Sequence, residues 1–260
     1  MSHLALSYTL RLGRSHRPEP FLVGATVEHV GARTVVLSRL GELVYLTDDS
    51  AGLMPGGHTL TPAGIARLRS ELAPLGVGVQ IDRGWSEPTT GRPTSLELPN
   101  VRLSPLRVRE LGHLVDGSHL DAGLRDALAS LVGDASPSEA IGSLIGTGPG
   151  TTPSGDDVLV GVLAGWQLTG QVHRLTTARA LITALLPATT RASGHFLRWA
   201  MAGSYATPVL DLARALADEG SLAHAMTALR RFGATSGHDL AIGLATTLAG
   251  DSGHVQRSAA

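Results

Sequence analysis

The residues best suited to chemistry lie in a glycine-rich run, 146–157, that reads Gly-Thr-Gly-Pro-Gly-Thr-Thr-Pro-Ser-Gly-Asp-Asp and leads into the apolar stretch 158–168. Glycines let a backbone turn sharply and approach a ligand closely, and Ser154 is a residue type that caps helices. The first turn of a helix presents free N–H groups and the positive end of the helix dipole. The run therefore predicts an anion-binding loop at a helix start, suited to phosphate or carboxylate.

The end of this run recurs later in the chain. Ser154-Gly155-Asp156-Asp157 is followed by Gly161, and Ser236-Gly237-His238-Asp239 is followed at the same spacing by Gly243. One interpretation is that two helix starts converge on a single ligand, which Ser236 and Gly237 contact together with the first loop. The other is a pair of helix caps. In each of them the serine side chain would cap the helix, and the side chain of the aspartate three residues later would accept a hydrogen bond from the serine N–H. The sequence leaves both open.

The charged residues of the two motifs are candidates for catalysis. Asp156 and Asp157 point about 100° apart on a helix, so they do not form a simple carboxylate dyad. One of them could face the ligand while the other caps or binds a cation, and Asp156 is the candidate ligand for a magnesium ion. Magnesium is possible, and no other cofactor is indicated. His238, at the position equivalent to Asp156, is a candidate general acid or base or else a structurally idle histidine.

A second group of candidates lies between the motifs, where Arg191, His195 and Arg198 follow helical spacing. This spacing places three cations on one helix face, which would line an anion pocket or remain a solvated basic surface. Arg191 follows Thr189-Thr190 at a helix start, and its guanidinium matches phosphate and carboxylate geometry. The other histidines, His119 among them, show no metal-ligand spacing, and we assign them no role. A second glycine-rich loop, 52–58, either approaches the same ligand or forms a turn.

The composition excludes several classes of enzyme. The chain of 260 residues has no cysteine and no lysine, so thiolate nucleophiles, zinc–thiolate sites, Schiff-base chemistry and the Walker A phosphate loop are all ruled out. A net charge of −1 and 3% aromatic residues argue against nucleic acid or a membrane surface as partner. No apolar stretch reaches the roughly 18 residues of a spanning helix. We expect a cytoplasmic protein that binds a small anionic substrate.

The pattern along the chain predicts an α+β protein with a strand-rich domain, 1–105, and an α-helical domain, 106–260, that carries the glycine-rich loop. The first is expected to be a small sheet or barrel with one helix, Ala63–Leu72, after Thr61-Pro62. Its strands are predicted at Phe21–Val30, Arg33–Leu40, Glu42–Leu46 and Val77–Ile81. Helices in the second domain are predicted at 107–115, 121–132, 137–145, 156–169, 175–186, 190–202, 208–219, 222–232 and 239–249.

Taken together, the glycine-rich run, Thr189-Thr190 with Ser193, and the second motif resemble the AllH-like family, which includes a subunit of bacterial oxamate carbamoyltransferase. The resemblance is specific in the loop and vague in the N-terminal half. It implies transfer of a carbamoyl group between phosphate and oxamate (giving oxalurate) in purine and allantoin catabolism, together with partner subunits. The alternatives are a non-catalytic anion-binding or scaffolding subunit of a larger enzyme, and a magnesium-dependent phosphate-ester or nucleotide enzyme.

The resemblance also implies roles for the candidate residues. The loop backbone would hold the phosphate, Arg191 would grip the phosphate or the acceptor carboxylate, and Asp157 or Asp239 would orient the loop or the amine. Carbamoyl transfer needs no covalent nucleophile, which fits a chain without cysteine or lysine. The candidate catalytic residues are Asp157, His238 and Asp239. The candidate binding residues are Gly148, Gly150, Thr152, Ser154, Gly155, Arg191, Ser236 and Gly237.

Overall fold

A computed structural model describes residues 23–48, 52–81, 96–133 and 137–257. The chain divides into two compact units, Met1–Ser95 and Leu96–Ala260. The first contains a sheet and a helix and the second is helical, so the predicted α+β class is confirmed. No helix in the described ranges is both long and apolar enough to cross a membrane.

The first unit is an open four-stranded sheet in the order β1-β2-β3-β4. Three strands pair antiparallel, and the short β4 pairs parallel to β3 before α1 begins behind the cap of Thr61. Apolar side chains from the sheet and from α1 form a separate core. The elements are β1 Thr26–Val30, β2 Thr34–Arg39, β3 Glu42–Asp48, β4 His58–Leu60 and α1 Pro62–Leu72.

Two details of this unit differ from the sequence prediction. The segment predicted as a strand at Val77–Ile81 hydrogen-bonds along β1 but forms only one bridge, Thr26 with Gln80. Gly78 within the segment and Gly76 just before it have φ values of +87° and +84°, which break extended pairing. The loop 52–58 leads into β4, a strand too short to give a periodic signal.

The second unit contains the predicted helices, each placed within a few residues of its expected range, except that the last continues to Arg257 rather than ending at Ala249. Helix α5 is buried along nearly its whole length. The helices are α2 Pro105–Leu114, α3 Ala122–Val132, α4 Pro137–Leu144, α5 Ser154–Leu168, α6 Val172–Leu185, α7 Arg191–Met201, α8 Thr207–Leu216, α9 Leu222–Arg230 and α10 Ser236–Arg257, with a 3-10 turn at Leu186–Ala188.

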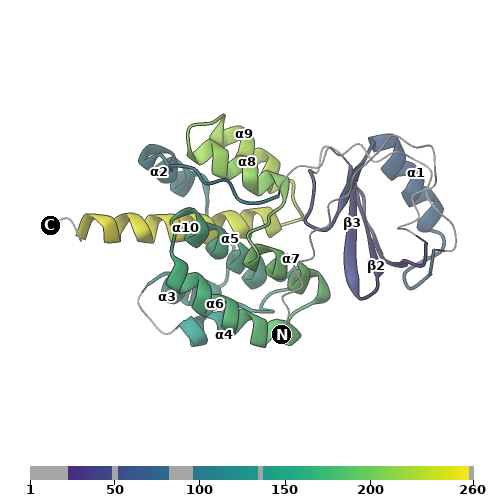
Figure 1. Cartoon of the computed structure of the whole chain (residues 1–260), viewed down its shortest axis with the longest axis horizontal. Coiled ribbons are helices and arrows are strands. Elements are labelled where there is room, and N and C mark those ends of the chain that lie inside the picture. The colour runs from purple at the N-terminus through teal and green to yellow at the C-terminus, as the bar shows by residue number, and fades with distance from the viewer. Residues whose placement is uncertain (1–22, 49–51, 82–95, 134–136, 258–260) are drawn as a thin grey trace. The chain divides into compact units, whose positions relative to one another are not determined.

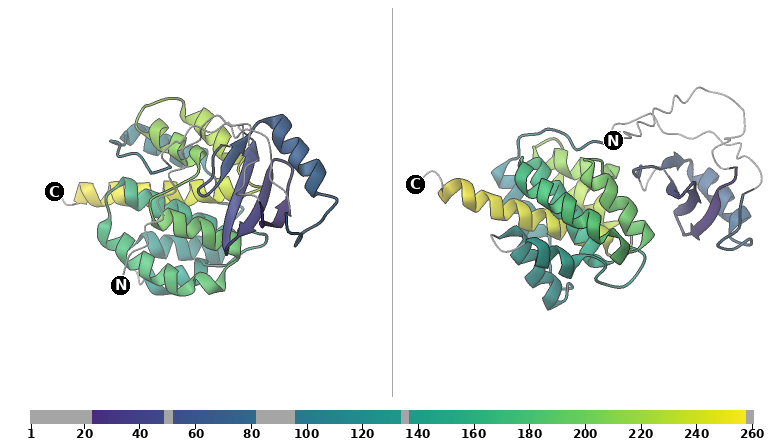
Figure 2. Two further views of the ribbon diagram at one scale, coloured as in Figure 1. Left: turned by 45° about the vertical axis from the view of Figure 1, so that its right-hand side comes forward. Right: turned by 60° about the horizontal axis from the view of Figure 1, so that its bottom comes forward.

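Helices α5 and α10 form the centre of this unit. Figure 1 shows α8 and α9 on one side of this pair and α3, α4 and α6 on the other, and α10 extends beyond the bundle at its C-terminal end in both views of Figure 2. The contacts between α5 and α10 are reciprocal. A Cβ atom on Gly161 would lie 2.0 Å from the Leu240 carbonyl oxygen, and one on Gly243 would lie 2.2 Å from that of Val158.

Further along, Gly165 of α5 packs against Thr247 of α10. The contacts therefore advance in the same direction on both helices, so α5 and α10 run the same way. Their N-terminal ends, which carry the two Ser-Gly-x-Asp motifs, lie at the same end of the bundle. Glycine is required at the crossing because the two backbones touch there, and any side chain would separate them.

Replacing Gly161 by alanine should therefore destabilise the protein by about 1–3 kcal/mol or more, because the added methyl group overlaps a backbone oxygen that cannot move alone. Urea unfolding measures the change. Gly142→Ala in α4 is the matched control, because nothing lies within 4 Å of its added Cβ. Alanine there should be neutral or stabilise the helix by up to about 1 kcal/mol. Equal stabilities for the two variants would contradict the close crossing.

Candidate functional site

The first motif begins α5, but its serine is not the cap. The helix is preceded by Pro153, whose carbonyl oxygen accepts hydrogen bonds from the backbone N–H groups of Asp156 and Asp157. Ser154 is the first helical residue and makes no capping bond with its side chain. The predicted serine cap is therefore wrong here, because proline, with its fixed φ, occupies the capping position and moves the serine into the first turn.

The second motif has the same local geometry. The carbonyl oxygen of Thr235 accepts from the N–H groups of His238 and Asp239 at 2.8 and 3.0 Å, so Ser236 is again the first residue of its helix. The Asp239 N–H that a serine cap would bind is already satisfied by a carbonyl. The capping-box interpretation therefore fails for both motifs, and the recurrence needs another explanation.

The glycines of the motifs serve packing. The N–H of Gly155 donates to the Thr147 carbonyl, and that of Gly237 donates to the Phe232 carbonyl, both at 2.9 Å. A Cβ on either would overlap a carbonyl oxygen at the end of the preceding helix, at 2.0 Å for Gly155 and 1.8 Å for Gly237. These two N–H groups, which we predicted to bind phosphate, are thus used within the chain.

Side chains link the two helix starts directly. The hydroxyl groups of Thr152 and Ser236 lie 2.8 Å apart, although the two residues are more than eighty positions apart in the sequence. The carboxyl group of Asp157 hydrogen-bonds with the same two hydroxyls and lies within electrostatic reach of Asp239. The structure therefore brings the two Ser-Gly-x-Asp motifs together at one place.

The loop between Gly146 and Ser154 offers N–H donors at this place. Gly148 and Gly150 have φ values of +118° and +95°, conformations that favour glycine. Several backbone N–H groups donate to no other residue in the described ranges. They belong to Gly148, Gly150, Thr151, Thr152 and Ser154.

Asp156 holds the beginning of this loop. One carboxylate oxygen accepts from the Gly146 N–H at 2.9 Å, and the other accepts from the Thr189 hydroxyl at 2.5 Å. Both oxygens of our candidate metal ligand are thus engaged within the protein. The described residues contain no group of three or more histidine, aspartate or glutamate side chains arranged to hold a metal ion. Magnesium at Asp156 stays a prediction from sequence.

Asp157 is a buried carboxyl group that is an unusually weak acid. Burial raises its pKa from 3.8 to about 8; nearby Asp239 and Asp156 add to this, and the hydroxyls of Ser236 and Thr152 oppose it. At pH 7 the group is therefore mostly neutral. Its Oδ2 atom is buried and has no hydrogen-bond partner among the described residues. A buried polar atom left open in this way needs a partner that the described residues do not supply.

Asp239 has its own partner, one that the sequence did not reveal. The residue is fully buried, and its Oδ1 atom lies 2.5 Å from Nε2 of His119. Its Oδ2 atom is buried and, like that of Asp157, has no partner in the described part of the chain. His119 stands in the turn between α2 and α3, and no spacing in the sequence relates it to either motif. Only the tertiary fold brings it here.

Helix α7 contributes a third helix start. The Thr190 hydroxyl caps α7 at the Ser193 N–H and also donates to the Thr151 carbonyl of the loop at 2.6 Å. Arg191 follows directly and is exposed. The predicted basic face is not formed, because His195 is buried at 2% exposure among aromatic rings while Arg198 is exposed.

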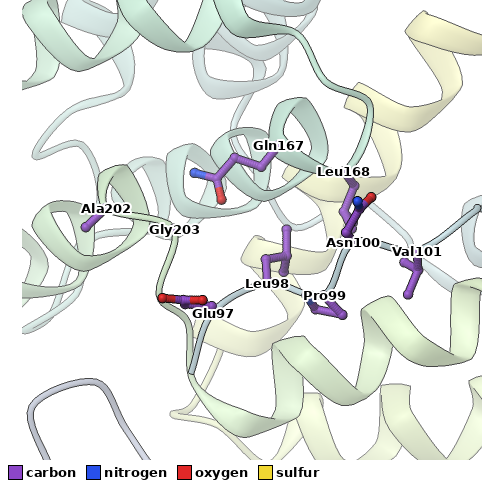
Figure 3. Close-up of a pocket in the computed structure, with 9 residues that line it drawn as sticks. All are labelled: Glu97, Leu98, Pro99, Asn100, Val101, Gln167, Leu168, Ala202 and Gly203. Atoms are coloured by element: carbon purple, nitrogen blue, oxygen red, sulfur yellow. The ribbon is translucent and has the colours of Figure 1, made fainter. Parts of the chain in front are cut away.

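A separate pocket of about 310 Å³ lies in the same unit (Figure 3). It is formed by residues 97–101, by Gln167 and Leu168 of α5, and by Ala202 and Gly203 after α7. Gln167 stands near the C-terminal end of α5, about 20 Å along the helix from Ser154 at 1.5 Å per residue. The pocket therefore does not include the residues of the two motifs.

The helical fold and the joined helix starts define a class: a helical module with a glycine-rich loop and a buried acidic pair between two repeated motifs. Residues 144–248 match the family model described as oxamate carbamoyltransferase subunit AllH, which confirms the resemblance to the AllH-like family. The match begins at the end of α4 and ends within α10, so it spans both motifs. No solved structure matches the chain.

The raised pKa of Asp157 makes stability depend on pH. Because the folded pKa, about 8, lies above the unfolded value of 3.8, the group's contribution is fully present below pH 3.8 and is lost as pH rises through 8. Relative to Asp157→Asn, the wild type should lose up to about 1.4 kcal/mol per pH unit across this window. Denaturant unfolding at several pH values measures the difference.

Asp126→Asn, which changes an exposed aspartate of α3, is the control for the loss of a carboxylate. Its stability difference from the wild type should change much less over the same range. A wild-type minus Asp157→Asn difference that stays constant between pH 4 and 8 would contradict a neutral Asp157.

Proposed function

We propose that this chain is a subunit of a carbamoyltransferase and that it binds a small anionic substrate, carbamoyl phosphate or the oxamate and oxalurate pair, at the loop 148–154. The observation that carries the proposal is the set of unengaged N–H groups in this loop, at the start of α5 and beside a second helix start. The match of residues 144–248 to a family described as an oxamate carbamoyltransferase subunit supports it.

The electrostatics of the site favour an anion. The N-terminal ends of α5 and α10 both contribute partial positive charge there, and the loop supplies N–H donors as anion-binding helix starts do. An ionised carboxylate beside such a ligand would repel it. Burial keeps the pKa of Asp157 at about 8, so at pH 7 this group is a neutral acid that can donate a hydrogen bond.

The residues also suit carbamoyl transfer. In this reaction the acceptor nitrogen attacks the carbamoyl carbon, the bond from that carbon to the phosphate oxygen breaks, and the nitrogen loses a proton. The protein must hold the phosphate, place the acceptor and stabilise the developing negative charge. We assign the first task to the loop backbone, the second to Arg191 and the third to N–H donors with the neutral Asp157. The chain would thus serve purine or allantoin breakdown.

Ligand binding tests the anion site directly. Thermal unfolding of the full chain with carbamoyl phosphate, oxamate, oxalurate or phosphate should show stabilisation of about 2.7 kcal/mol at 100 times the dissociation constant. A further sample with magnesium and a nucleotide tests the alternative, a magnesium-dependent phosphate-ester or nucleotide enzyme. Stabilisation by that pair alone would replace the proposal with a nucleotide enzyme.

Arg191→Gln should weaken binding of the stabilising anion at least tenfold, about 1.4 kcal/mol, because a bidentate charged contact is lost. Arg198→Gln is the matched control: it removes an exposed arginine from the same helix, two turns further on. Isothermal titration measures both affinities. Equal affinities for the two variants would remove Arg191 from the site.

Turnover separates an enzyme from a scaffold. We expect phosphate release from carbamoyl phosphate and oxamate when the chain is combined with proteins that co-purify with it from its source. Phosphate release by the chain alone would make it a complete catalyst. Anion binding without turnover in either preparation would favour the non-catalytic subunit.

A further inference from the structure

The turn between α2 and α3, residues 115–121, meets the start of α10. We call it the His119 loop. It lies outside the segment 144–248 that matches the family, and no pattern in the sequence connects it with the site. Two of its residues, Asp116 and His119, contact His238 and Asp239 of the second motif.

The loop is held in shape by its own hydrogen bonds. The carboxylate of Asp116 accepts from both the N–H and the hydroxyl of Ser118, each at 2.8 Å. Leu120 is buried at 2% exposure and anchors the loop in the core, and Asp121 caps α3. The Asp116 carbonyl and the His119 ring are therefore presented to α10 by a fixed turn rather than by a loose connection.

The two imidazole rings are in different situations. Both ring nitrogens of His119 face oxygen acceptors: Nε2 lies 2.5 Å from Asp239 Oδ1, and Nδ1 lies 3.3 Å from the Asp116 carbonyl oxygen. A neutral imidazole carries one N–H, and we place it on Nε2, which makes the shorter contact. Neither nitrogen of His119 is left for a substrate. The His238 ring packs edge-on against it, with 4.8 Å between the ring centroids.

His238 uses one nitrogen. Its Nε2 lies 2.8 Å from the same Asp116 carbonyl oxygen. A carbonyl only accepts hydrogen bonds, so Nε2 carries the hydrogen and Nδ1 of the neutral ring carries the lone pair. No described residue contacts that Nδ1 atom through a hydrogen bond. Of the four ring nitrogens in the pair, this is the one that faces no hydrogen-bonding atom of the described residues, so it is the one open to a ligand.

We propose that the His119 loop completes the site: the Asp116 carbonyl fixes the tautomer of His238, and His119, held by the buried Asp239, is the positioning residue that keeps this arrangement. The proposal rests on the proposed function for its chemical meaning. In carbamoyl transfer, Nδ1 of His238 takes the proton that leaves the acceptor nitrogen as the new C–N bond forms and phosphate departs.

Nuclear magnetic resonance of the full chain labelled with ¹⁵N-histidine tests the arrangement without any ligand. Long-range ¹H–¹⁵N spectra, recorded about 2 pH units above the ordinary histidine pKa of about 6.5, report which ring nitrogen carries the hydrogen. The signal that disappears in His238→Gln identifies His238. We expect that signal in wild type to show a single tautomer, with the hydrogen on Nε2. A hydrogen on Nδ1, or rapid exchange between both forms, would overturn the proposal.

In His119→Ala, the ¹⁵N signals of His238 should indicate a mixture of tautomers. The substitution removes the His119 ring that packs against both the His238 ring and the Asp116 carbonyl, so neither is held in place. His173→Ala, an exposed histidine of α6, is the control and should leave them unchanged. Unaltered His238 signals in His119→Ala would show that His119 has no positioning role. If His119→Ala does not fold, His119→Gln, which can still donate to Asp239, takes its place.

The tautomer measurement does not depend on the substrate, so it separates this proposal from the proposed function. A fixed Nε2–H tautomer together with no response of His238 to carbamoyl phosphate or oxamate would leave the arrangement standing and contradict the carbamoyl-transfer assignment. A mixture of His238 tautomers together with clear anion binding would contradict the arrangement of the His119 loop and leave the anion-binding part of the proposed function standing.

Discussion

The close crossing of α5 and α10 is the constraint on which the helical unit depends. Two glycines, Gly161 and Gly243, let each backbone rest against a carbonyl of the other helix. Because the helices also run the same way, their two starts meet, and the contacts between the two motifs follow from that. The Thr152–Ser236 hydroxyl pair and the proximity of Asp157 to Asp239 are consequences of the crossing.

The site concentrates polar groups that a purely structural core would avoid. Asp157 and Asp239 each bury an oxygen that has no hydrogen bond within the described residues, and the Ser193 hydroxyl close to the α7 start is in the same condition. Each such group costs folding free energy, because water satisfied it in the unfolded chain. Natural proteins tolerate such costs mainly where function requires them. Asp156, by contrast, has both oxygens satisfied and serves to hold the loop.

Local signals in the sequence predicted the framework well. Apolar periodicity and proline or threonine starts predicted α1 and the helices of the second unit. For the repeated motif, the sequence left two interpretations open, and the meeting of two helix starts was one of them. Features decided by tertiary contacts could not be predicted in this way. Gly155 is a packing glycine because of a carbonyl in the preceding helix, and His195 is buried because of the side chains around α7.

The two serines show that a motif can suggest the wrong role for a residue. Ser154 and Ser236 are residue types that cap helices, yet the preceding Pro153 and Thr235 take that position through their carbonyl groups. His119 shows that a residue outside any motif can still belong to the site. It belongs to no motif, and its contact with Asp239 joins positions 120 residues apart, a separation that only the folded chain can bridge.

The reciprocal contacts of α5 and α10 give the pair an approximate two-fold symmetry, but the third position of the motif breaks it. One helix has Asp156 there, whose carboxylate is fully used to hold the loop, and the other has His238, which keeps one ring nitrogen open. A symmetric cradle would accept a small two-ended ligand in either direction. This difference makes the two ends of the pair chemically distinct, so a ligand bound between them would have a preferred direction.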